Sequence, residues 1–395
     1  MCGTLTQQLD RPHPATYLGK GKLDELGAKA RDLDASLVLF DDELSPAQGK
    51  NVEQATGVRV MDRAELILDI FATRARSNEA KLQVELAQLQ YMLPRLTRMW
   101  THLEKFRGGI GMRGPGETQL ETDRRLINHR IRVLKERLAG VVRARETQRA
   151  GREGAFRAAL VGYTNAGKSS VLRGLSGQEV FVEDRLFATL DPLTREVSLG
   201  AGLHALVTDT VGFVRKLPHQ LVASFRATLE EAQEADLLLH VIDASHPQWE
   251  EQRDVVDQVV GEVGAGEVPV LYVLNKIDRM DPEEAVNVAT RLRGEGVEVV
   301  TASAVAPGGL DALTAALAEA LQQARRTVEL RIPPTEGRAL AQVRRLGEVL
   351  EERYEDDGTA VLRVVLETKA VNQLARTTSI DLRPASAGPP PVPLP

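Results

Sequence analysis

The chain has 395 residues and a mass of 43.2 kDa, which exceeds one ordinary hydrophobic core and predicts two or three domains. Charged residues at 27% and hydrophobic residues at 43% are typical of a soluble globular protein, and no apolar run is long enough to span a membrane. The first ten residues lack a basic-then-apolar signal pattern, and the single cysteine, Cys2, excludes an internal disulfide and a cysteine-based zinc site. We therefore expect a cytoplasmic protein without a membrane span.

The formal net charge of −6 is unevenly distributed along the chain. Residues 94–152 carry 15 Lys or Arg against 6 Asp or Glu, so one basic segment lies in an otherwise acidic protein. Evenly spread, the negative charge would argue against a nucleic-acid partner, whereas a basic segment favours one.

Residues 1–76 alternate helix-like and strand-like patterns, which predicts a small parallel α/β unit. We expect helices over 19–34, 45–56 and 64–75 and strands over 36–40 and 58–61. Ser45 and Pro46 fit the cap and the first position of the second helix. The first strand of the unit should be missing or very short, because residues 4–16 contain two prolines and little apolar periodicity.

Residues 77–153 carry two leucine stripes spaced by threes and fours, over 82–103 and 120–142, which predict a long antiparallel helical hairpin. Pro94 should kink the first helix or split it at Leu93. Between the stripes, residues 108–116 form a loop with five glycines in nine residues, longer than helix-to-helix closure requires.

Two interpretations of this glycine loop remain open. It is either a solvated flexible tip or a probe whose backbone can approach phosphates or bases. The flanking basic residues favour the probe and an RNA target. The predicted RNA contacts are Gly108, Gly109, Gly111, Arg113, Gly114, Arg124 and Arg125.

Residues 154–326 alternate strands and helices in the pattern of a doubly wound sheet, with strands over 156–161, 197–199, 203–208, 237–242, 269–274 and 297–301. Residues 327–382 predict a small α+β domain with strands 328–331 and 360–366, a helix over 339–353 and a short helix near 370–375. The proline-rich tail, residues 383–395, is expected to be disordered.

A phosphate-binding motif, G-x-x-x-x-G-K-[ST], follows the apolar run 158–161 and precedes a helix-compatible run. Its backbone N–H groups and the helix N-terminus would hold nucleotide phosphates. Lys168 would reach the β- and γ-phosphates, and Ser169 would ligate magnesium. The predicted nucleotide contacts are Gly162, Tyr163, Thr164, Asn165, Ala166, Gly167, Lys168, Ser169 and Ser170.

A D-x-x-G motif ends a later predicted strand. Asp209 would hold the magnesium through water, and the Gly212 N–H would contact a γ-phosphate, so that loss of this phosphate releases the loop. Downstream, Asn275 and Lys276 would brace the phosphate loop and the base. The Asp278 carboxylate, which we expect to be buried, would accept two hydrogen bonds from guanine that adenine cannot supply.

The backbone N–H of Ala304, in the stretch Ser303, Ala304 and Val305, would meet guanine O6. Together these motifs, in this order, predict a P-loop GTPase domain that binds GTP or GDP with magnesium. In the first switch, near Phe187, the magnesium-coordinating residue should be Thr189, with Thr194 as the alternative. The candidate catalytic residues are Lys168, Thr189, Gly212 and Asn165.

Phe213 follows Gly212 at a position where many switch GTPases carry a glutamine that orients the attacking water. We therefore expect slow intrinsic hydrolysis that a partner or a bound ion accelerates. Asn165 in the phosphate loop motivates a second hypothesis, a potassium ion beside the phosphates.

Several stretches extend these motifs into a resemblance over nearly the whole chain: RPHPATY at 11–17, GKGK at 19–22, ELAQL at 85–89, GGIGMRGPGETQLETDRR at 108–125, GYTNAGKSS at 162–170, FATLDPLTR at 187–195 and DTVGFVRKLPHQLV at 209–222. The chain resembles the HflX family of ribosome-associated GTPases, and the glycine loop with its ETQLE sequence is the most specific part. Family members usually have further residues, including a strand, before the stretch at 11–17, which leaves nucleotide binding by the N-terminal unit open.

This resemblance implies a partner and an activity. A member would bind the large (50S) ribosomal subunit, as a monomer by our expectation, with the hairpin and glycine loop contacting 23S rRNA near the peptidyl-transferase region. It would dissociate stalled or idle 70S ribosomes in a GTP-dependent manner. The alternative is a regulatory module that uses GTP to time its hold on RNA or the ribosome without splitting it. A P-loop ATPase or small-molecule kinase is disfavoured by Asp278.

Overall fold

The computed structural model describes residues 2–8, 11–96, 115–150, 155–178, 187, 189–215, 231–367, 370–371, 374 and 381–384. The chain divides into two compact units, each with its own hydrophobic core. The first unit comprises Met1–Arg143, Asp184–Asp191 and Val211–Glu230, and the second comprises Ala144–Glu183, Pro192–Thr210 and Glu231–Pro395. The domain limits expected at residues 76, 153, 326 and 382 remain predictions, because this division follows other limits. Within the described ranges, no helix combines the length and apolarity needed to cross a membrane.

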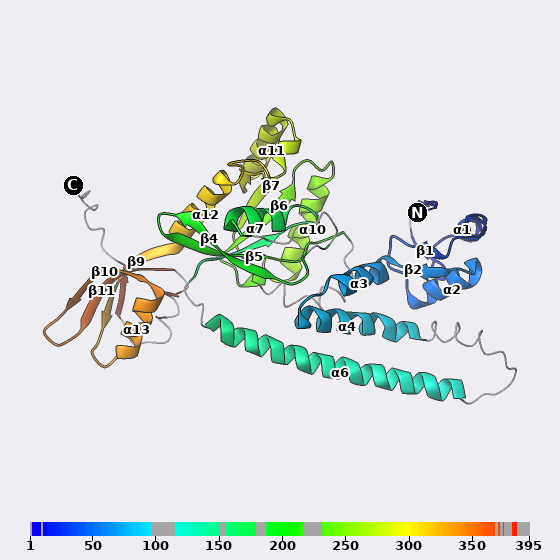
Figure 1. Ribbon diagram of the computed structural model, residues 1–395, viewed down its shortest axis with the longest axis horizontal. Helices are drawn as coiled ribbons and strands as arrows, with labels where there is room; N and C mark the ends of the chain where they lie inside the picture. The colour runs from blue at the N-terminus through cyan, green and yellow to red at the C-terminus, as the bar shows by residue number, and fades with distance from the viewer. Residues whose placement is uncertain are drawn as a thin grey trace. The chain divides into compact units, whose positions relative to one another are not determined.

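The first unit begins with the expected parallel α/β arrangement (Figure 1). Its elements are α1 (Lys20–Asp32), β1 (Leu37–Leu39), α2 (Pro46–Thr56), β2 (Arg59–Met61) and α3 (Arg63–Arg74). Strands β1 and β2 pair in parallel, with Leu37 opposite Arg59. At the start of α2, the Ser45 side chain accepts a hydrogen bond from the Gln48 N–H and the Gln48 side chain accepts one from the Ser45 N–H. This reciprocal cap explains why the helix begins at Pro46.

Two helices of the predicted hairpin follow, α4 (Asn78–Met92) and α6 (Pro115–Ala150). Helix α4 gives way to a 3₁₀ turn, η1 (Leu93–Arg95), which confirms the predicted split at Leu93 and follows from the missing N–H of Pro94. Helices α4 and α6 run antiparallel side by side (Figure 1), and Leu82, Leu86 and Leu134 are buried between them. The predicted RNA contacts in residues 108–114 lie outside the described residues.

The second unit is built on a mixed six-stranded sheet, which confirms the α/β class. The strands are β3 (Arg157–Val161), β4 (Leu193–Gly200), β5 (Leu203–Asp209), β6 (Leu237–Asp243), β7 (Val270–Asn275) and β8 (Glu298–Thr301). Their order is β4-β5-β3-β6-β7-β8, and only the β4–β5 pair is antiparallel. The chain starts at β3 and fills the sheet on both sides of it, so the carboxyl end of β3 lies at the point where the strand order reverses.

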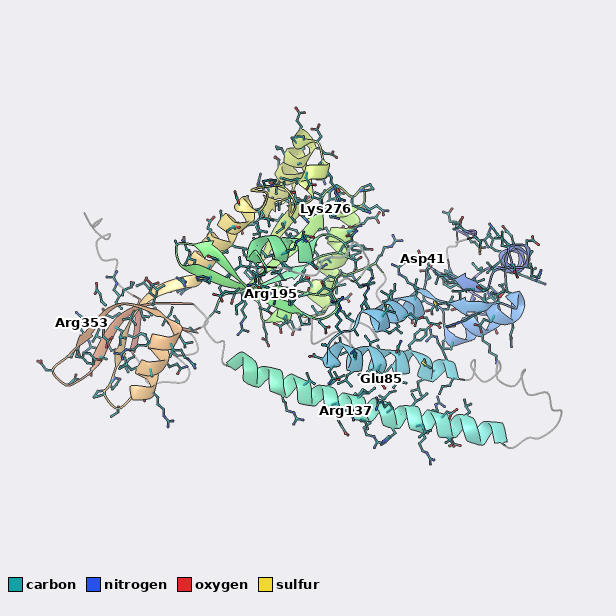
Figure 2. All side chains as sticks on the ribbon, in the orientation of Figure 1. Asp41, Glu85, Arg137, Arg195, Lys276 and Arg353 are labelled. Carbon is teal, nitrogen blue, oxygen red and sulfur yellow. The ribbon has the colours of Figure 1, made fainter. Side chains whose placement is uncertain are left out.

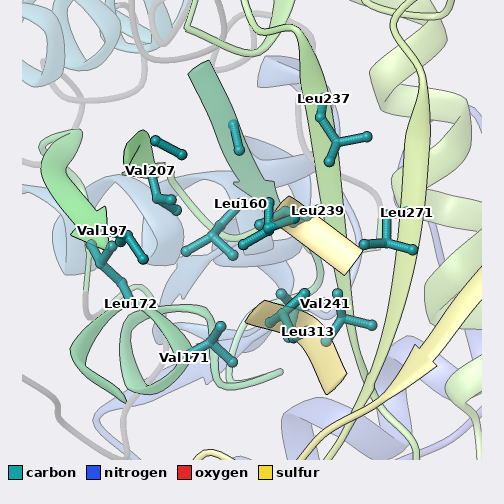
Figure 3. Packing of buried hydrophobic residues seen from close by; sticks show 14 of the residues in the cluster. Leu160, Val171, Leu172, Val197, Val207, Leu237, Leu239, Val241, Leu271 and Leu313 are labelled. Carbon is teal, nitrogen blue, oxygen red and sulfur yellow. The ribbon is translucent and has the colours of Figure 1, made fainter. Parts of the chain in front are cut away.

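Helices cover both faces of this sheet. On one face, residues of α7 (Lys168–Ser176) and α12 (Asp311–Ala324) join the strands in one core; Figure 3 shows Leu172 and Leu313 beside Leu160 and Leu239. On the other face, Trp249 of α10 (Trp249–Glu262) and Leu292 of α11 (Pro282–Gly294) form a second cluster. With both faces covered, the strand ends are left for a ligand site.

The C-terminal part forms a four-stranded antiparallel sheet in the order β10-β11-β9-β12, with α13 (Gly337–Leu346) packed against it. The strands are β9 (Arg325–Ile332), β10 (Glu348–Tyr354), β11 (Ala360–Glu367) and β12 (Asp381–Pro384). Of the short helix expected near 370–375, the described residues 370, 371 and 374 are helical.

Two sequence predictions for this part need correction. The helix expected over 339–353 ends at Leu346, and residues 348–354 form strand β10 instead. A Cβ on Gly347 would lie 2.6 Å from side-chain atoms of Val364 and Leu366, so the chain turns here where only glycine fits. Disorder was expected from residue 383, but Arg383 and Pro384 pair with β9, and residues 385–395 lie outside the described residues.

Candidate nucleotide-binding site

The phosphate loop follows β3 and needs glycine at both ends. At Gly162, φ is +154° and a Cβ would lie 2.3 Å from the Val241 carbonyl oxygen. At Gly167, φ is +99° and a Cβ would lie 2.2 Å from the Asn275 side-chain nitrogen. Any other residue at either position would therefore displace a neighbouring strand end or its side chain.

Lys168 is the first residue of α7, and its side chain is buried within the loop. Its Nζ donates hydrogen bonds to the carbonyls of Gly162 (3.2 Å) and Tyr163 (3.1 Å). Burial lowers the pKa of Lys168 from 10.5 to about 8, although the nearby Asp209 carboxylate acts in the opposite direction. The loop thus wraps around a desolvated ammonium group whose charge a bound phosphate would stabilise.

Ser169 and Asp209 come together beside the loop, although 40 residues separate them. The Ser169 hydroxyl donates to Asp209 Oδ2 at 2.6 Å, and Asp209 is fully buried at the end of β5. A hydroxyl and one carboxylate suit magnesium, which takes its remaining ligands from water and phosphate oxygens. Among the described residues, no group of three or more His, Cys, Asp or Glu could hold a metal without such help.

The Thr164 hydroxyl is another polar group of the loop that suits a ligand. Thr164 is buried, and its Oγ1 has no hydrogen-bond partner within the part of the chain that the structure describes. Buried polar groups are normally paired, so a bound anion is a suitable acceptor for this hydroxyl.

Two residues after β7 hold the phosphate loop from the side. The Asn275 side chain, 1% exposed, donates to the Ala166 carbonyl at 2.8 Å. Lys276, labelled in Figure 2, donates to the Asn165 carbonyl and to Asp243 Oδ2, both at 2.7 Å. The predicted bracing residues therefore join the base-recognition segment to the phosphate loop.

The residues expected at the base lie together but differ from expectation in two details. The Ser303 hydroxyl donates to Asp278 Oδ1 at 2.6 Å, which orients the carboxylate. Asp278 is exposed rather than buried, so only a bound base could desolvate it. The Ala304 N–H lies 3.3 Å from Asn275 Oδ1, so guanine O6 would share or replace this acceptor. Val305 is 71% exposed.

Phe187, Thr189 and Gly212 belong to the other compact unit, and their roles at this site stay predictions. The alternative for the first switch, Thr194, lies in strand β4. The Thr194 hydroxyl lies 2.9 Å from the Thr208 hydroxyl, across the β4–β5 pair. This contact does not decide between the two residues, and Thr189 and Thr194 both stay predictions for the magnesium ligand.

Asp243 is a site residue that the sequence analysis did not identify. Besides Lys276, it binds the Ser245 hydroxyl, which donates to Oδ1 at 2.6 Å. A signal was present in the sequence, because Asp243 directly follows the apolar run of β6, at the same sheet edge as the phosphate loop.

The lowered pKa of Lys168 predicts a pH-dependent affinity for GTP. Below about pH 8 the ammonium is charged and the dissociation constant should be flat. Above it, binding must take up a proton, so log Kd should rise by up to about one per pH unit. Equilibrium titration between about pH 7 and pH 9 tests this, and a flat profile across the range would contradict it.

Replacing Asp278 by Asn should weaken GTP binding about a hundredfold, because an amide nitrogen would face the guanine donors and two hydrogen bonds to a charged group would be lost. Affinity for ATP should change little. The matched control is Asp281→Asn, three residues away, where Asp281 caps α11 by accepting from the Glu283 N–H at 2.9 Å. Equal GTP affinities for the two variants would refute the assignment of Asp278.

Three family models match successive parts of the chain. Residues 1–72 match a model described as GTP-binding GTPase N-terminal, and residues 74–152 match GTP-binding GTPase Middle Region. Residues 157–276, which contain the phosphate loop, match a model described as 50S ribosome-binding GTPase.

Relatives that match over much of their length agree with these matches. GTPase HflX of Escherichia coli K12 is 46% identical over 365 residues, covering 91% of this chain and 84% of the relative. GTPase HflX of Caldanaerobacter subterraneus is 45% identical, covering 91% and 82%. GTPase HflX of Flavobacterium psychrophilum is 50% identical over a shorter match, covering 69% of this chain and 66% of the relative.

Among solved structures, a GTP-binding protein from the archaeon Sulfolobus solfataricus in complex with GDP is similar to this chain. The two are 26% identical with a TM-score of 0.44, over 80% of this chain and 89% of the archaeal one. The family models and these relatives together establish that the chain belongs to the HflX family of GTPases.

Proposed function

We propose that this GTPase binds the large (50S) ribosomal subunit and dissociates stalled or idle 70S ribosomes in a GTP-dependent manner. Its family membership and the match of residues 157–276 to a 50S ribosome-binding GTPase model support this function. The hairpin would contact 23S rRNA through α6 and the glycine loop, with the protein acting as a monomer in the cytoplasm.

The observation that carries this proposal is the exposed positive charge of α6. Between residues 121 and 143, the helix has seven Lys or Arg against three Asp or Glu. Arg130 forms a bidentate ion pair with Glu85 of α4, with N–O distances of 2.6 and 2.9 Å. Figure 2 labels Arg137 on the same helix. The exposed basic side chains include Arg124, Arg125, Arg132, Lys135 and Arg137.

This charge suits RNA because it remains after the apolar seam is formed. Leu134 is fully buried, while Arg125 and Arg132 are exposed and lie seven residues apart, two turns along one flank of the helix. Cations in such a row can each neutralise a phosphate and release its counterions, which is the main source of affinity for a polyanion.

GTP hydrolysis at the nucleotide site would set how long the protein stays bound to the ribosome. When bound, magnesium would neutralise charge on the β- and γ-phosphates, and its proposed ligands are Ser169, Thr189 and, through water, Asp209. The Gly212 N–H would sense the γ-phosphate, and a potassium ion beside Asn165 would add positive charge. Phe213 has no group that could orient water, so hydrolysis by the isolated protein should be slow and the ribosome should complete the site.

Sucrose-gradient analysis of 70S ribosomes tests the proposal. With the protein and GTP or a non-hydrolysable analogue, we expect new free subunits, and with GDP the ribosomes should stay intact. Removing residues 109–115 should abolish splitting while GTP binding is retained. Co-migration with the large subunit without free subunits would contradict splitting and support the alternative, a binding module timed by GTP.

The same gradient can test the role of α6 with a charge-matched pair of variants. Arg125→Ala with Arg132→Ala should weaken ribosome binding about tenfold and lower its salt dependence by about two phosphate contacts. The control, Arg326→Ala with Arg338→Ala, removes two exposed charges from the C-terminal part and should bind normally. Equal losses in both pairs would show that only net charge matters.

A further inference from the structure

The first switch segment is attached to the junction between α3 and α4, within the first compact unit. The Phe187 ring packs edge-on against the Phe71 ring of α3, with centroids 4.5 Å apart and planes at 79°. Both rings are almost fully buried, at 3% and 1% exposure. An edge-to-face aromatic pair with this burial is a specific contact, so the segment is held here by shape as well as by hydrophobicity.

A second anchor lies four residues along, at Asp191. Its Oδ2 accepts hydrogen bonds from the backbone N–H groups of Arg76 (3.3 Å) and Ser77 (3.0 Å), and the Ser77 hydroxyl donates to Oδ1. Ser77 is also the N-cap of α4, because its side chain accepts from the Ala80 N–H at 3.0 Å. One hydroxyl therefore joins the switch carboxylate to the start of the hairpin, where negative charge is favourable.

The backbone at the Phe187 anchor is constrained. Phe187 has φ of +56°, a left-handed conformation that is unfavourable for a bulky side chain and persists only where surrounding contacts hold it. Thr189 lies two residues from each anchor. Part of the conformational entropy that ordering this segment would cost is thus already lost before any ligand binds.

Helix α4 is also fixed at its far end. The Arg95 guanidinium donates to the Leu44 carbonyl at 2.6 Å and lies 3.4 Å from Asp62 Oδ2, while the Tyr91 hydroxyl donates to Asp62 Oδ1 at 2.8 Å. All three side chains are buried, and Arg95 stacks on the Tyr91 ring at 3.7 Å. With both ends of α4 held, the Ser77 hydroxyl that donates to Asp191 is fixed relative to the rest of the first unit.

We propose that Ser77 and Phe71 are positioning residues for the first switch, which anchor Asp191 and Phe187 so that Thr189 is pre-ordered for magnesium and its state is coupled to the root of the hairpin. The inference rests on the proposed role of Thr189 as a magnesium ligand. It adds two residues, Ser77 and Phe71, that lie more than a hundred positions earlier in the chain and act on Thr189 through Asp191 and Phe187.

The test compares magnesium-dependent binding of a non-hydrolysable GTP analogue with binding of GDP. Ser77→Ala should raise both the analogue Kd and the half-maximal magnesium concentration about fivefold to tenfold, the size expected for one hydrogen bond to a carboxylate. GDP affinity should change less than twofold, because the switch contact requires the γ-phosphate. Ser77→Thr, which keeps a hydroxyl, should restore analogue binding.

Ser45→Ala is the matched control, because Ser45 caps α2 in the same unit by the same chemistry, with its side chain accepting a hydrogen bond from the Gln48 N–H of its own helix. It should lose helix stability without changing the analogue-to-GDP ratio. The proposal is overturned if Ser77→Ala matches Ser45→Ala, if it weakens both nucleotides equally, or if it tightens analogue binding.

Thr189→Ala separates this inference from the proposed function on which it rests. If Thr189→Ala raises the magnesium requirement and Ser77→Ala does not, Thr189 remains the ligand and the positioning role is refuted. If Thr189→Ala leaves the magnesium requirement unchanged, the ligand assignment itself fails and the positioning role falls with it. Phe71→Leu, which removes the ring contact, should give the same analogue-selective loss as Ser77→Ala.

Discussion

The hydrogen bond from Asn275 to the Ala166 carbonyl, 2.8 Å long, is the contact on which the nucleotide site depends most. It requires a glycine at position 167, because the amide nitrogen occupies the place of a Cβ. The C=O and N–H of a trans peptide point in opposite directions, so drawing the Ala166 carbonyl toward β7 turns the Gly167 N–H the other way, where α7 begins. The loop that would bind phosphate is thus shaped by the segment that would bind the base.

At the first switch segment, too, one side chain joins two parts of the structure, the switch segment and the N-terminus of α4. Asp191 ends the first switch segment and also supplies acceptors to the N-terminus of α4. This contact joins the first helix of the basic hairpin to a segment proposed to respond to the γ-phosphate. Under the proposed function, this shared residue would give a physical route by which the nucleotide state alters RNA binding by the hairpin.

Much of the fold followed from local pattern, because a strand or a capped helix is specified by a few adjacent residues. Ser45, Pro46 and Gln48 defined the start of α2, and Pro94 defined the end of α4. Strand β10 was missed because its residues continue a helix-like pattern, and the break at Gly347 is enforced by β11, which follows later in the chain.

The site residues that could be predicted are those that lie within a short sequence motif. Asp243 and the exposure of Asp278 were not, since each depends on which strand ends become neighbours. The Ser77–Asp191 contact spans 114 residues, which no local pattern can reveal.

Under the proposed function, the nucleotide state controls the affinity of a basic hairpin for ribosomal RNA. The most direct measurement is the affinity of the protein for isolated 50S subunits, with a non-hydrolysable GTP analogue and with GDP, at several salt concentrations. We predict at least about tenfold tighter binding with the analogue, and an affinity that falls steeply with salt in both states. Equal affinities with the two nucleotides would contradict control of RNA binding by the nucleotide state.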